Sequence, residues 1–447
     1  MNDNKIAVIG SGITGLTSAY FLQKGGYKVS IFERRDSVGG AIRTEKQEKW
    51  LTEFGPNTIL LKDAVVAEFL EEIGLSSEKV VANQLASKRF IVKSGILEPL
   101  PTSIISAFKT PLFSFKGKLR VLTEPMISKN ENRDQTIAEF VERRLGKEIL
   151  DYAINPFVAG IFANKPENLS LRHTLPMMDN LEELYGSLIW GSFKGRKERN
   201  KNGRIARELI SFKDGLHELP KRVASLIDSI YLNHEVTKVS KSEDGWSVST
   251  QQGEFDGFSD VIINAPISKW SAELFPFEVG KFDEVNYPPL SVMHIGYKKS
   301  DIDHPMDGFG FLVPEKENRD ILGALFSSTL FPGRAPDDCH LLTVFVGGGR
   351  QPELAAMDSE QLLNVIEKDL KDFIGLKGKP VFKNHVYWPN SIPAYHVGYD
   401  EILQSLLKIE VENPGIHFAG NYRGGVSVPD CIKNGISIAE RLSSDSD

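Results

Sequence analysis

Two hydrophobic patterns alternate at the start of the chain. Residues 6–9 (IAVI) form a short apolar run, and residues 28–32 (KVSIF) form a second one. Between the two runs, apolar residues from Leu16 to Leu22 recur at the spacing of one helix face. The pattern predicts a buried strand, a helix and a second strand, as at the start of an α/β domain.

The rest of the chain repeats both patterns. They predict a helix with apolar positions Val65, Val66, Phe69, Leu70 and Ile73, a hairpin over 88–95 and an apolar helical stretch over 104–126. Further predicted helices cover 218–227 and 359–373 and begin again at Pro429, and predicted strands cover 231–239, 246–250, 260–265, 291–297, 310–313, 321–326 and 341–347. The chain is therefore predicted to have a mixed α/β fold, with an antiparallel sheet after residue 270.

Composition limits the classes of function. The chain has 447 residues, of which 41% are hydrophobic and 25% are charged, so we expect two or three domains with real cores. A net charge of −7 gives no electrostatic reason to bind nucleic acid. The basic run over 194–207 contains glycine and asparagine and is predicted to be a solvated loop rather than a nucleic-acid or anionic-lipid contact.

Other signals bear on location and on alternative chemistry. Cys339 and Cys431 are far apart, which excludes a disulfide framework and fits a reducing compartment. MNDNK leads directly into the first strand, so we expect no secretory signal, and no segment approaches the ~20 apolar residues that span a bilayer. The cytoplasm is the expected location. The histidines show no metal-ligand spacing, and no metal site is predicted.

A glycine motif joins the first predicted strand to its helix. Gly10, Gly12 and Gly15 have the GxGxxG spacing, in which the backbone approaches a pyrophosphate at the helix N-terminus. Glu33 ends the second strand, where an acidic residue accepts hydrogen bonds from ribose hydroxyls. The arrangement predicts dinucleotide binding, and the alternative is a purely structural glycine turn.

Residues 38–44 (VGGAIRT) resemble the GGxxRT motif of the flavin amine oxidase superfamily. The resemblance implies FAD as the cofactor, and a non-covalent FAD, because no cysteine lies near the closing glycine turn at Gly420. The implied cofactor-binding residues are Gly10, Gly12, Ile13, Thr14, Gly15, Glu33, Arg34, Gly39, Gly40, Arg43, Gly55, Pro56, Asn57, Val236, Ala265, Trp388, Gly420, Asn421, Val426, Ser427 and Val428. Two alternatives stay open: Asn57 as a helix cap and Val236 as a core residue.

Several further motifs resemble the protoporphyrinogen oxidase family. They are Arg89-Phe90 at the start of the hairpin, the LPTS turn at 100–103, and the segments 155–163, 322–336 and 345–348. The resemblance implies a Rossmann-like FAD-binding domain from the discontinuous segments 1–83, 212–275 and 398–447, and a substrate-binding domain from 84–99, 181–211 and 276–397. It implies a helical, membrane-facing subdomain over 100–180. For Ile104, Ile105, Phe108, Leu112, Phe113 and Phe115 the alternative is a buried helical core.

The resemblance also assigns substrate contacts. Arg89 would bind a propionate, as a guanidinium binds a carboxylate through two parallel hydrogen bonds. Leu312 and Leu325 would sandwich one pyrrole ring and Phe345 would pack on another, with Gly160 and Asn57 also facing the substrate. A flat apolar macrocycle needs such faces. The alternatives are a surface ion pair for Arg89 and core packing for the apolar residues.

The function implied by this resemblance is oxidation of protoporphyrinogen IX to protoporphyrin IX in haem biosynthesis, with removal of six electrons and formation of hydrogen peroxide from oxygen. The nearest alternative is a flavin-dependent coproporphyrinogen III oxidase; a flavin amine oxidase or carotenoid desaturase is more remote, and a non-catalytic flavoprotein is last. Porphyrinogen and oxygen are the implied partners. Attachment to the inner face of the cell membrane, a haem-pathway enzyme partner and a homodimer stay open.

Overall fold

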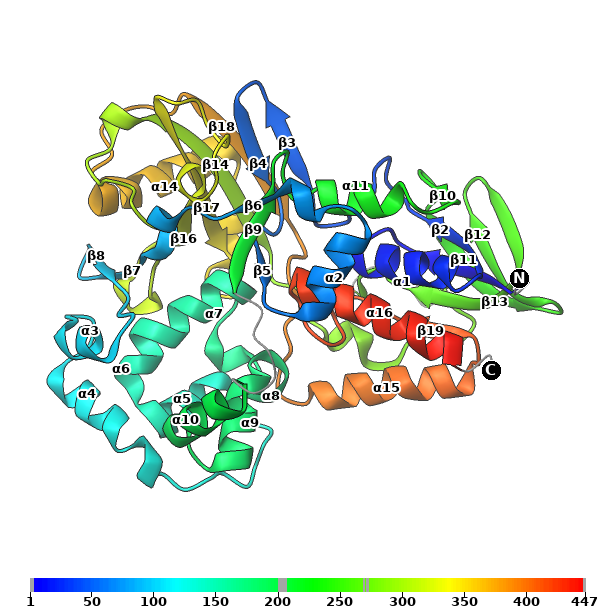
Figure 1. Cartoon of the computed structure of the whole chain (residues 1–447), viewed down its shortest axis with the longest axis horizontal. Helices are drawn as coiled ribbons and strands as arrows, with labels where there is room; N and C mark the ends of the chain where they lie inside the picture. Colours follow the sequence, from blue (N-terminus) through cyan, green and yellow to red (C-terminus); the bar gives the residue numbers. More distant parts are fainter. Residues whose placement is uncertain (1–3, 200–206, 268–269, 271–272, 445–447) are drawn as a thin grey trace.

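The computed structural model describes residues 4–199, 207–267, 270 and 273–444, and Figure 1 shows its three regions. A sheet with parallel central strands lies near both chain ends. A seven-stranded mixed sheet and a group of helices make up the opposite half of the molecule. The chain therefore has the mixed α/β fold that its hydrophobic pattern predicts.

The first region is a sheet covered by helices on both faces. Five of its strands are parallel, in the order β10 (Ile230–Tyr231), β2 (Lys28–Phe32), β1 (Lys5–Ile9), β13 (Gly253–Ile263) and β19 (Ile416–Phe418). One face packs on α1 (Ile13–Lys24), α2 (Ala64–Glu72), α11 (Glu218–Ala224) and α16 (Val428–Ser444), and the other on α15 (Tyr399–Glu412). Strands from distant parts of the sequence thus build one core.

The strand predicted over 231–239 is wrong, because the structure divides it in two. β10 pairs in parallel with β2, whereas β11 (Val236–Ser242) pairs antiparallel with β12 (Gly245–Thr250). Between them Asn233 has a φ of 58°, which an extended strand does not allow. The apolar pattern continues across a turn that it does not reveal.

The second region is the mixed sheet. Its order is β18 (Phe382–Trp388), β14 (Leu290–Lys298), β17 (Cys339–Gly347), β16 (Ile321–Phe326), β15 (Gly310–Leu312), β7 (Arg89–Lys93) and β8 (Ile96–Pro99). Every pair is antiparallel except β15 with β7, which joins the early hairpin to the later sheet in parallel. One face packs on α14 (Ser359–Ile374). The short helices α12 (Ser327–Leu330) and α13 (Pro352–Ala355) follow β16 and β17.

Two small sheets connect these regions. β3 (Thr44–Gln47) pairs with β4 (Trp50–Glu53), and β9 (Glu208–Phe212) lies between β5 (Ile59–Leu61) and β6 (Lys79–Val81). In α2 the predicted core positions are buried except Val65, which is 45% exposed, so that part of the pattern is wrong. Asp63, not Asn57, is the residue before α2, which overturns the alternative of Asn57 as its cap.

The third region is helical. It contains α3 (Ile104–Lys109), α4 (Phe115–Leu122), α5 (Ile137–Leu145), α6 (Lys147–Ile149), α7 (Asn155–Phe162), α8 (Leu171–Thr174), α9 (Pro176–Tyr185) and α10 (Leu188–Arg199). Arg144 is fully buried and binds Glu182 at 2.6 Å and Glu124 at 2.8 Å, so α5, α9 and the turn after α4 are tied together. The helical cluster thus continues past residue 180, since α10 packs on α9.

The stretch 104–126 is helical as predicted, and it divides into α3, α4 and a short 3₁₀ turn, with a break at residues 110–114. One prediction about this region is wrong. The basic segment 194–199 belongs to α10 rather than to a loop, and residues 200–206 lie outside the described part of the chain. Nowhere in the described ranges does a helix have the length and apolar character needed to span a bilayer.

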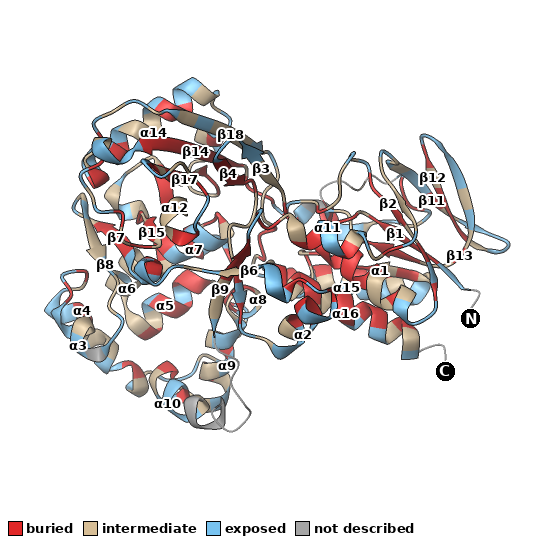
Figure 2. Cartoon of the chain, turned by 45° about the horizontal axis from the view of Figure 1, so that its top comes forward, coloured by how far each residue is buried: buried red, intermediate tan, exposed pale blue. Residues whose placement is uncertain are grey.

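Several apolar side chains of α3 and α4 are exposed, unlike those in the core of the molecule (Figure 2). Ile105, Phe108 and Phe115 are 70%, 55% and 75% exposed, which contradicts a buried helical core for these side chains. Leu112 is fully buried, as that alternative required. An exposed apolar group at one edge of the molecule follows.

Candidate functional site

The two glycine motifs near the N-terminus lie against each other. Gly12 and Gly39 form a parallel bridge, and the Gly39 N–H donates to the Ser11 carbonyl at 2.9 Å. A methyl group on Gly15 would lie 2.5 Å from the Gly10 carbonyl oxygen, so only glycine allows the helix to start this close to the strand. Ile13 and Thr14 are buried in the first turn of α1. The two glycine turns therefore lie together at the N-terminus of α1.

Glu33 lies next to the first glycine turn, directly after β2. Its Oε2 accepts from the Ser11 N–H at 2.9 Å and from the Ser11 hydroxyl at 2.7 Å, and Oε1 accepts from the Arg35 N–H at 3.0 Å. A carboxylate has about four acceptor positions, so at least one remains for a ribose hydroxyl. The neighbouring Arg34 is exposed, and Val236 and Ala265 lie half-buried at the ends of β11 and β13.

A second group forms around the turn after β4. The Phe54 N–H donates to the Arg43 carbonyl at 2.9 Å, and the Arg43 guanidinium lies 5.2 Å from the centre of the Phe54 ring. The Trp388 indole N–H donates to the Phe54 carbonyl at 2.9 Å. A methyl group on Gly55 would lie 2.1 Å from the Ala41 carbonyl oxygen, which keeps this turn against the second glycine motif. Pro56 and Asn57 follow, both half-buried.

A third turn, residues 420–427, closes the group from the C-terminal end. The Gly420 N–H donates to the Asn434 side chain at 3.2 Å, and the Ser427 hydroxyl accepts from the Asp430 N–H at 3.2 Å at the start of α16. Asn421 and Val426 lie half-buried within this turn, and Val428 begins the helix. Direct contacts thus join residues 10–15 to 39–43, and 41–43 to the turn 54–55, which Trp388 also contacts.

The register of the mixed sheet settles how the predicted substrate residues lie. Leu312, Gly323 and Phe345 form one row across β15, β16 and β17, and Gly310, Leu325 and Thr343 form a second row, two residues away along each strand. Residues in one row point to one face, and every second residue along a strand returns to it. Leu312, Leu325 and Phe345 therefore share one face, which we call the site face.

Two more predicted residues lie on the site face. Arg89 pairs with Gly310, in the same row as Leu325. Trp388 pairs with Leu290, two residues before Val292, the partner of Phe345. The other face carries Phe311, Ala324, Phe326 and Val344, which are buried under α14. The sheet thus separates a closed core from a face that points towards the glycine turns.

Helix α7 runs along the site face. A methyl group on Gly160 would lie 2.5 Å from Leu312 Cδ2, so helix and strand are in close contact there. Leu312, Leu325 and Phe345 are half-buried, and Leu325 and Phe345 also pack against buried apolar residues. Arg89 is exposed, with its guanidinium 5.1 Å from the centre of the Phe309 ring. Among the described residues it has no ion-pair partner, unlike the surface ion pair weighed from the sequence.

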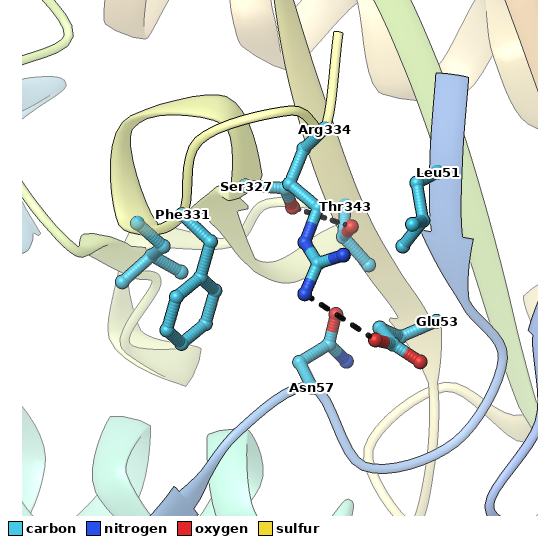
Figure 3. Close-up of a pocket in the computed structure, with 8 residues that line it drawn as sticks. Leu51, Glu53, Asn57, Ser327, Phe331, Arg334 and Thr343 are labelled. Carbon is cyan, nitrogen blue, oxygen red and sulfur yellow. Dashed lines mark hydrogen bonds and ion pairs between the residues drawn. The ribbon is translucent and has the colours of Figure 1, made fainter. Parts of the chain in front are cut away.

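A small cavity lies between the β4 turn and the site face (Figure 3). Its volume is about 10 Å³, and Glu53, Asn57, Arg334 and Thr343 line it together with Leu51, Ser327, Leu330 and Phe331. That is roughly the space one water needs. Arg334 donates to the Ser211 hydroxyl at 2.7 Å and lies 3.8 Å from the Glu53 carboxylate. Both contacts involve Arg334 Nη2. The other terminal nitrogen, Nη1, has no hydrogen-bond partner in the described part of the chain.

Burial controls the charge of Glu53. Its carboxylate accepts from the Thr44 hydroxyl at 2.5 Å and from the Leu216 N–H at 2.9 Å. These donors and Arg334 lower its pKa, but desolvation outweighs them and raises the pKa of Glu53 to about 7. The sequence alone does not single out Glu53 or Arg334 as site residues. Arg334 lies within the segment 322–336, but nothing in that segment indicates contact with Glu53, because the two residues lie far apart in the chain.

Comparison with known proteins gives the class of this chain. A family model described as flavin containing amine oxidoreductase matches residues 13–443, and the chain belongs to that family. It is therefore a FAD-dependent oxidoreductase.

Individual relatives narrow the comparison. The chain is 34% identical to protoporphyrinogen oxidase 2, chloroplastic/mitochondrial, of Arabidopsis thaliana, over 98% of this chain and 94% of that one. It is 26% identical to coproporphyrinogen III oxidase of Bacillus subtilis, over 97% of each chain. A crystal structure from Exiguobacterium sp. 255-15, described as a candidate protoporphyrinogen oxidase, superimposes with a TM-score of 0.84 at 23% identity and covers 100% of both chains, which shows the shared fold.

Proposed function

We propose that this chain oxidises protoporphyrinogen IX to protoporphyrin IX, with FAD as the cofactor and oxygen as the final acceptor. The observation that carries the proposal is the composition of the site face. It presents three half-buried apolar side chains, Leu312, Leu325 and Phe345, beside the Arg89 guanidinium, which has no ion-pair partner among the described residues. A flat apolar ring system with acidic side chains on one edge complements this arrangement.

The glycine turns fit the cofactor. Backbone N–H groups at the α1 N-terminus favour a pyrophosphate, and the remaining acceptor positions of Glu33 suit a ribose. Arg43, Gly55 and Trp388 would lie near the flavin ring, and residues 420–428 would hold its other side. When bound, FAD supplies the acceptor for two electrons in each of three successive oxidations.

The protein's own contribution is orientation. Leu312 and Leu325 would hold one pyrrole ring between them, and Phe345 would pack on a second. Arg89 would bind the propionate edge of the substrate. The reacting carbon would then be held in a fixed orientation relative to the flavin. Gly160 keeps α7 close to Leu312 and limits the water that reaches the ring. Proton loss needs no dedicated base, because the aromatic product drives it.

One observation favours protoporphyrinogen over coproporphyrinogen. Coproporphyrinogen carries two further propionates, which call for further free cations. Four basic side chains in or near these strands are engaged: Lys88 with Asp307, Lys93 with the Leu112 carbonyl at 2.7 Å, Lys165 with Glu315 at 2.6 Å, and Arg350 with Asn155 at 3.0 Å. Arg89, by contrast, has no polar side-chain partner in the described chain.

An anaerobic flavin assay tests the proposal. The purified holoenzyme is mixed with protoporphyrinogen IX or with coproporphyrinogen III, and loss of the oxidised flavin absorbance is followed. We expect faster bleaching with protoporphyrinogen. Faster bleaching with coproporphyrinogen III would show that coproporphyrinogen is the substrate instead. If neither porphyrinogen bleaches the flavin but an amine does, the chain acts as an amine oxidase.

The exposed apolar group on α3 and α4 supports a second proposal, peripheral contact with a membrane surface. Ile105, Phe108, Phe115 and Met126 are 70%, 55%, 75% and 85% exposed, and single large apolar side chains gain about 1.5–3 kcal/mol on full burial. In vesicle flotation we expect Phe108→Ser with Phe115→Ser to lower the bound fraction severalfold. Val411→Ser, at an exposed apolar position of α15, is the control and should not change binding.

A further inference from the structure

A group of buried tyrosines lies under the turn 420–427. Tyr395 is 4% exposed, and its hydroxyl donates to the Asn421 carbonyl and accepts from the Gly425 N–H at 3.2 Å. The Tyr399 ring centre is 4.7 Å away, and the Tyr399 hydroxyl donates to the Tyr422 carbonyl at 2.8 Å. Two side chains from one segment therefore hold the backbone of this turn.

The turn needs such anchors. Gly420, Gly424 and Gly425 have φ values of 130°, 87° and 122°, and glycine has more conformational freedom to lose than any other residue. Helix α16 holds the two ends of the turn, through the Asn434 side chain that accepts from the Gly420 N–H and through the Ser427 cap, but not its middle. The Tyr395 hydroxyl uses both its donor and its acceptor capacity on two residues that are four apart, which restricts the part between them.

The segment that carries Tyr395 is attached to the helical region. The Tyr395 carbonyl accepts from the Ser170 N–H at 2.7 Å, and Asp400 binds Arg172 at 2.7 Å. Ala394 packs in the apolar cluster of α5. One short segment is thus bonded on one side to the helices and on the other side to the turn.

We propose that Tyr395 is a positioning residue, whose hydroxyl fixes the turn against FAD and links the position of the helical region to the cofactor site. This role rests on FAD binding at the turn and not on which substrate is oxidised. A ligand that moves α8 would alter the flavin surroundings through this residue, with no direct contact between that ligand and the turn.

Tyr395→Phe is the first test, because it removes only the hydroxyl. We expect FAD to bind about tenfold more weakly to the apoprotein, as the Asn421 carbonyl and the Gly425 N–H, both in half-buried residues, lose their partner. We also expect a shifted flavin absorption spectrum and faster amide exchange at Gly425. The matched control is Tyr297→Phe. This tyrosine is buried under the far face of the mixed sheet, where its hydroxyl contacts Glu367 at 3.1 Å. FAD affinity, spectrum and Gly425 exchange equal to those of the control would overturn the proposal.

The link to the helices has its own test. Arg172→Gln breaks an exposed ion pair with Asp400, where both side chains are 45% exposed, and should leave the fold intact. We expect faster amide exchange across 420–427 in the FAD-bound protein. Unchanged exchange there would limit Tyr395 to holding the turn and refute the coupling. Because these readouts need no porphyrinogen, wild-type protein that binds FAD but oxidises no porphyrinogen would refute the proposed function alone.

Discussion

The two faces of the mixed sheet differ although the same strands build them. On the side of α14, Phe311, Phe326 and Val344 are between 0% and 2% exposed. On the site face, Leu312, Leu325 and Phe345 are as apolar but only half-buried. Large apolar groups gain free energy from burial, so the half-buried side chains of the site face agree with the proposal that a bound ligand covers them.

Paired substitutions on the two faces should give the largest effect. Phe326→Ala, under α14, should lower the free energy of unfolding by about 3–5 kcal/mol, since it leaves a cavity in a closed core. Phe345→Ala should cost well under half of that while raising KM for the porphyrinogen. Chemical denaturation and steady-state kinetics measure the two quantities. Equal stability losses for both variants would mean that Phe345 is a core residue.

A second prediction concerns the buried carboxylate behind the site face. The pKa of Glu53 rises from 4.5 in the unfolded chain to about 7 in the fold. The folded protein therefore binds this proton more tightly than the unfolded chain does. The stability that Glu53 contributes is fully present below pH 4.5 and is lost as the pH rises to about 7. Relative to Glu53→Gln, the wild-type free energy of unfolding should fall by roughly 3 kcal/mol across that window.

Denaturation curves of both proteins from pH 4.5 to pH 8 measure this difference. Glu412→Gln is the control, because that side chain is 58% exposed in an ion pair on the surface, and its difference from wild type should stay flat. A wild-type protein that grows more stable than Glu53→Gln towards pH 8 would show that Arg334 keeps the carboxylate charged.

The third and smallest expected effect concerns Arg89, whose guanidinium has no ion-pair partner in the part of the chain that the structure describes. Arg89→Ala should lower kcat/KM for the porphyrinogen about tenfold to a hundredfold, through loss of a charge-assisted contact, and leave thermal stability and bound FAD unchanged. Arg89→Lys should recover part of the loss. If flavin content falls in Arg89→Ala, the residue is structural and the assignment of the substrate edge to β7 is wrong.

Local patterns in the sequence predict the cofactor region well. Strand, glycine turn and helix follow within residues 5–24, so neighbouring residues determine the backbone there, and the observed β1 and α1 confirm the prediction. The same holds for β16, which is predicted with its observed bounds, 321–326. The roles of individual site residues stay predictions, although the structure brings the residues together.

Other features depend on contacts between distant segments. No periodicity shows that Arg334 meets Glu53, or that the Tyr395 hydroxyl reaches Gly425, because each pair forms only when separate elements pack. The helix over 194–199 is missed since its basic and glycine-containing sequence favours a loop, while packing of α10 on α9 favours a helix. Tertiary contacts override such weak local preferences.

The pairing of β1 with β13 and of β13 with β19 has a consequence for biosynthesis. β1 can pair with β13 only after residues 258–263 have been synthesised. β19 and the turn that follows it come only after residue 415. During translation, at about 5–20 residues per second, the growing polypeptide therefore carries an unfinished sheet edge for most of its synthesis. We expect a ribosome-bound fragment that ends before residue 400 to depend on chaperones and to bind no flavin. Once residues up to 444 are released, the sheet can be completed and FAD can bind.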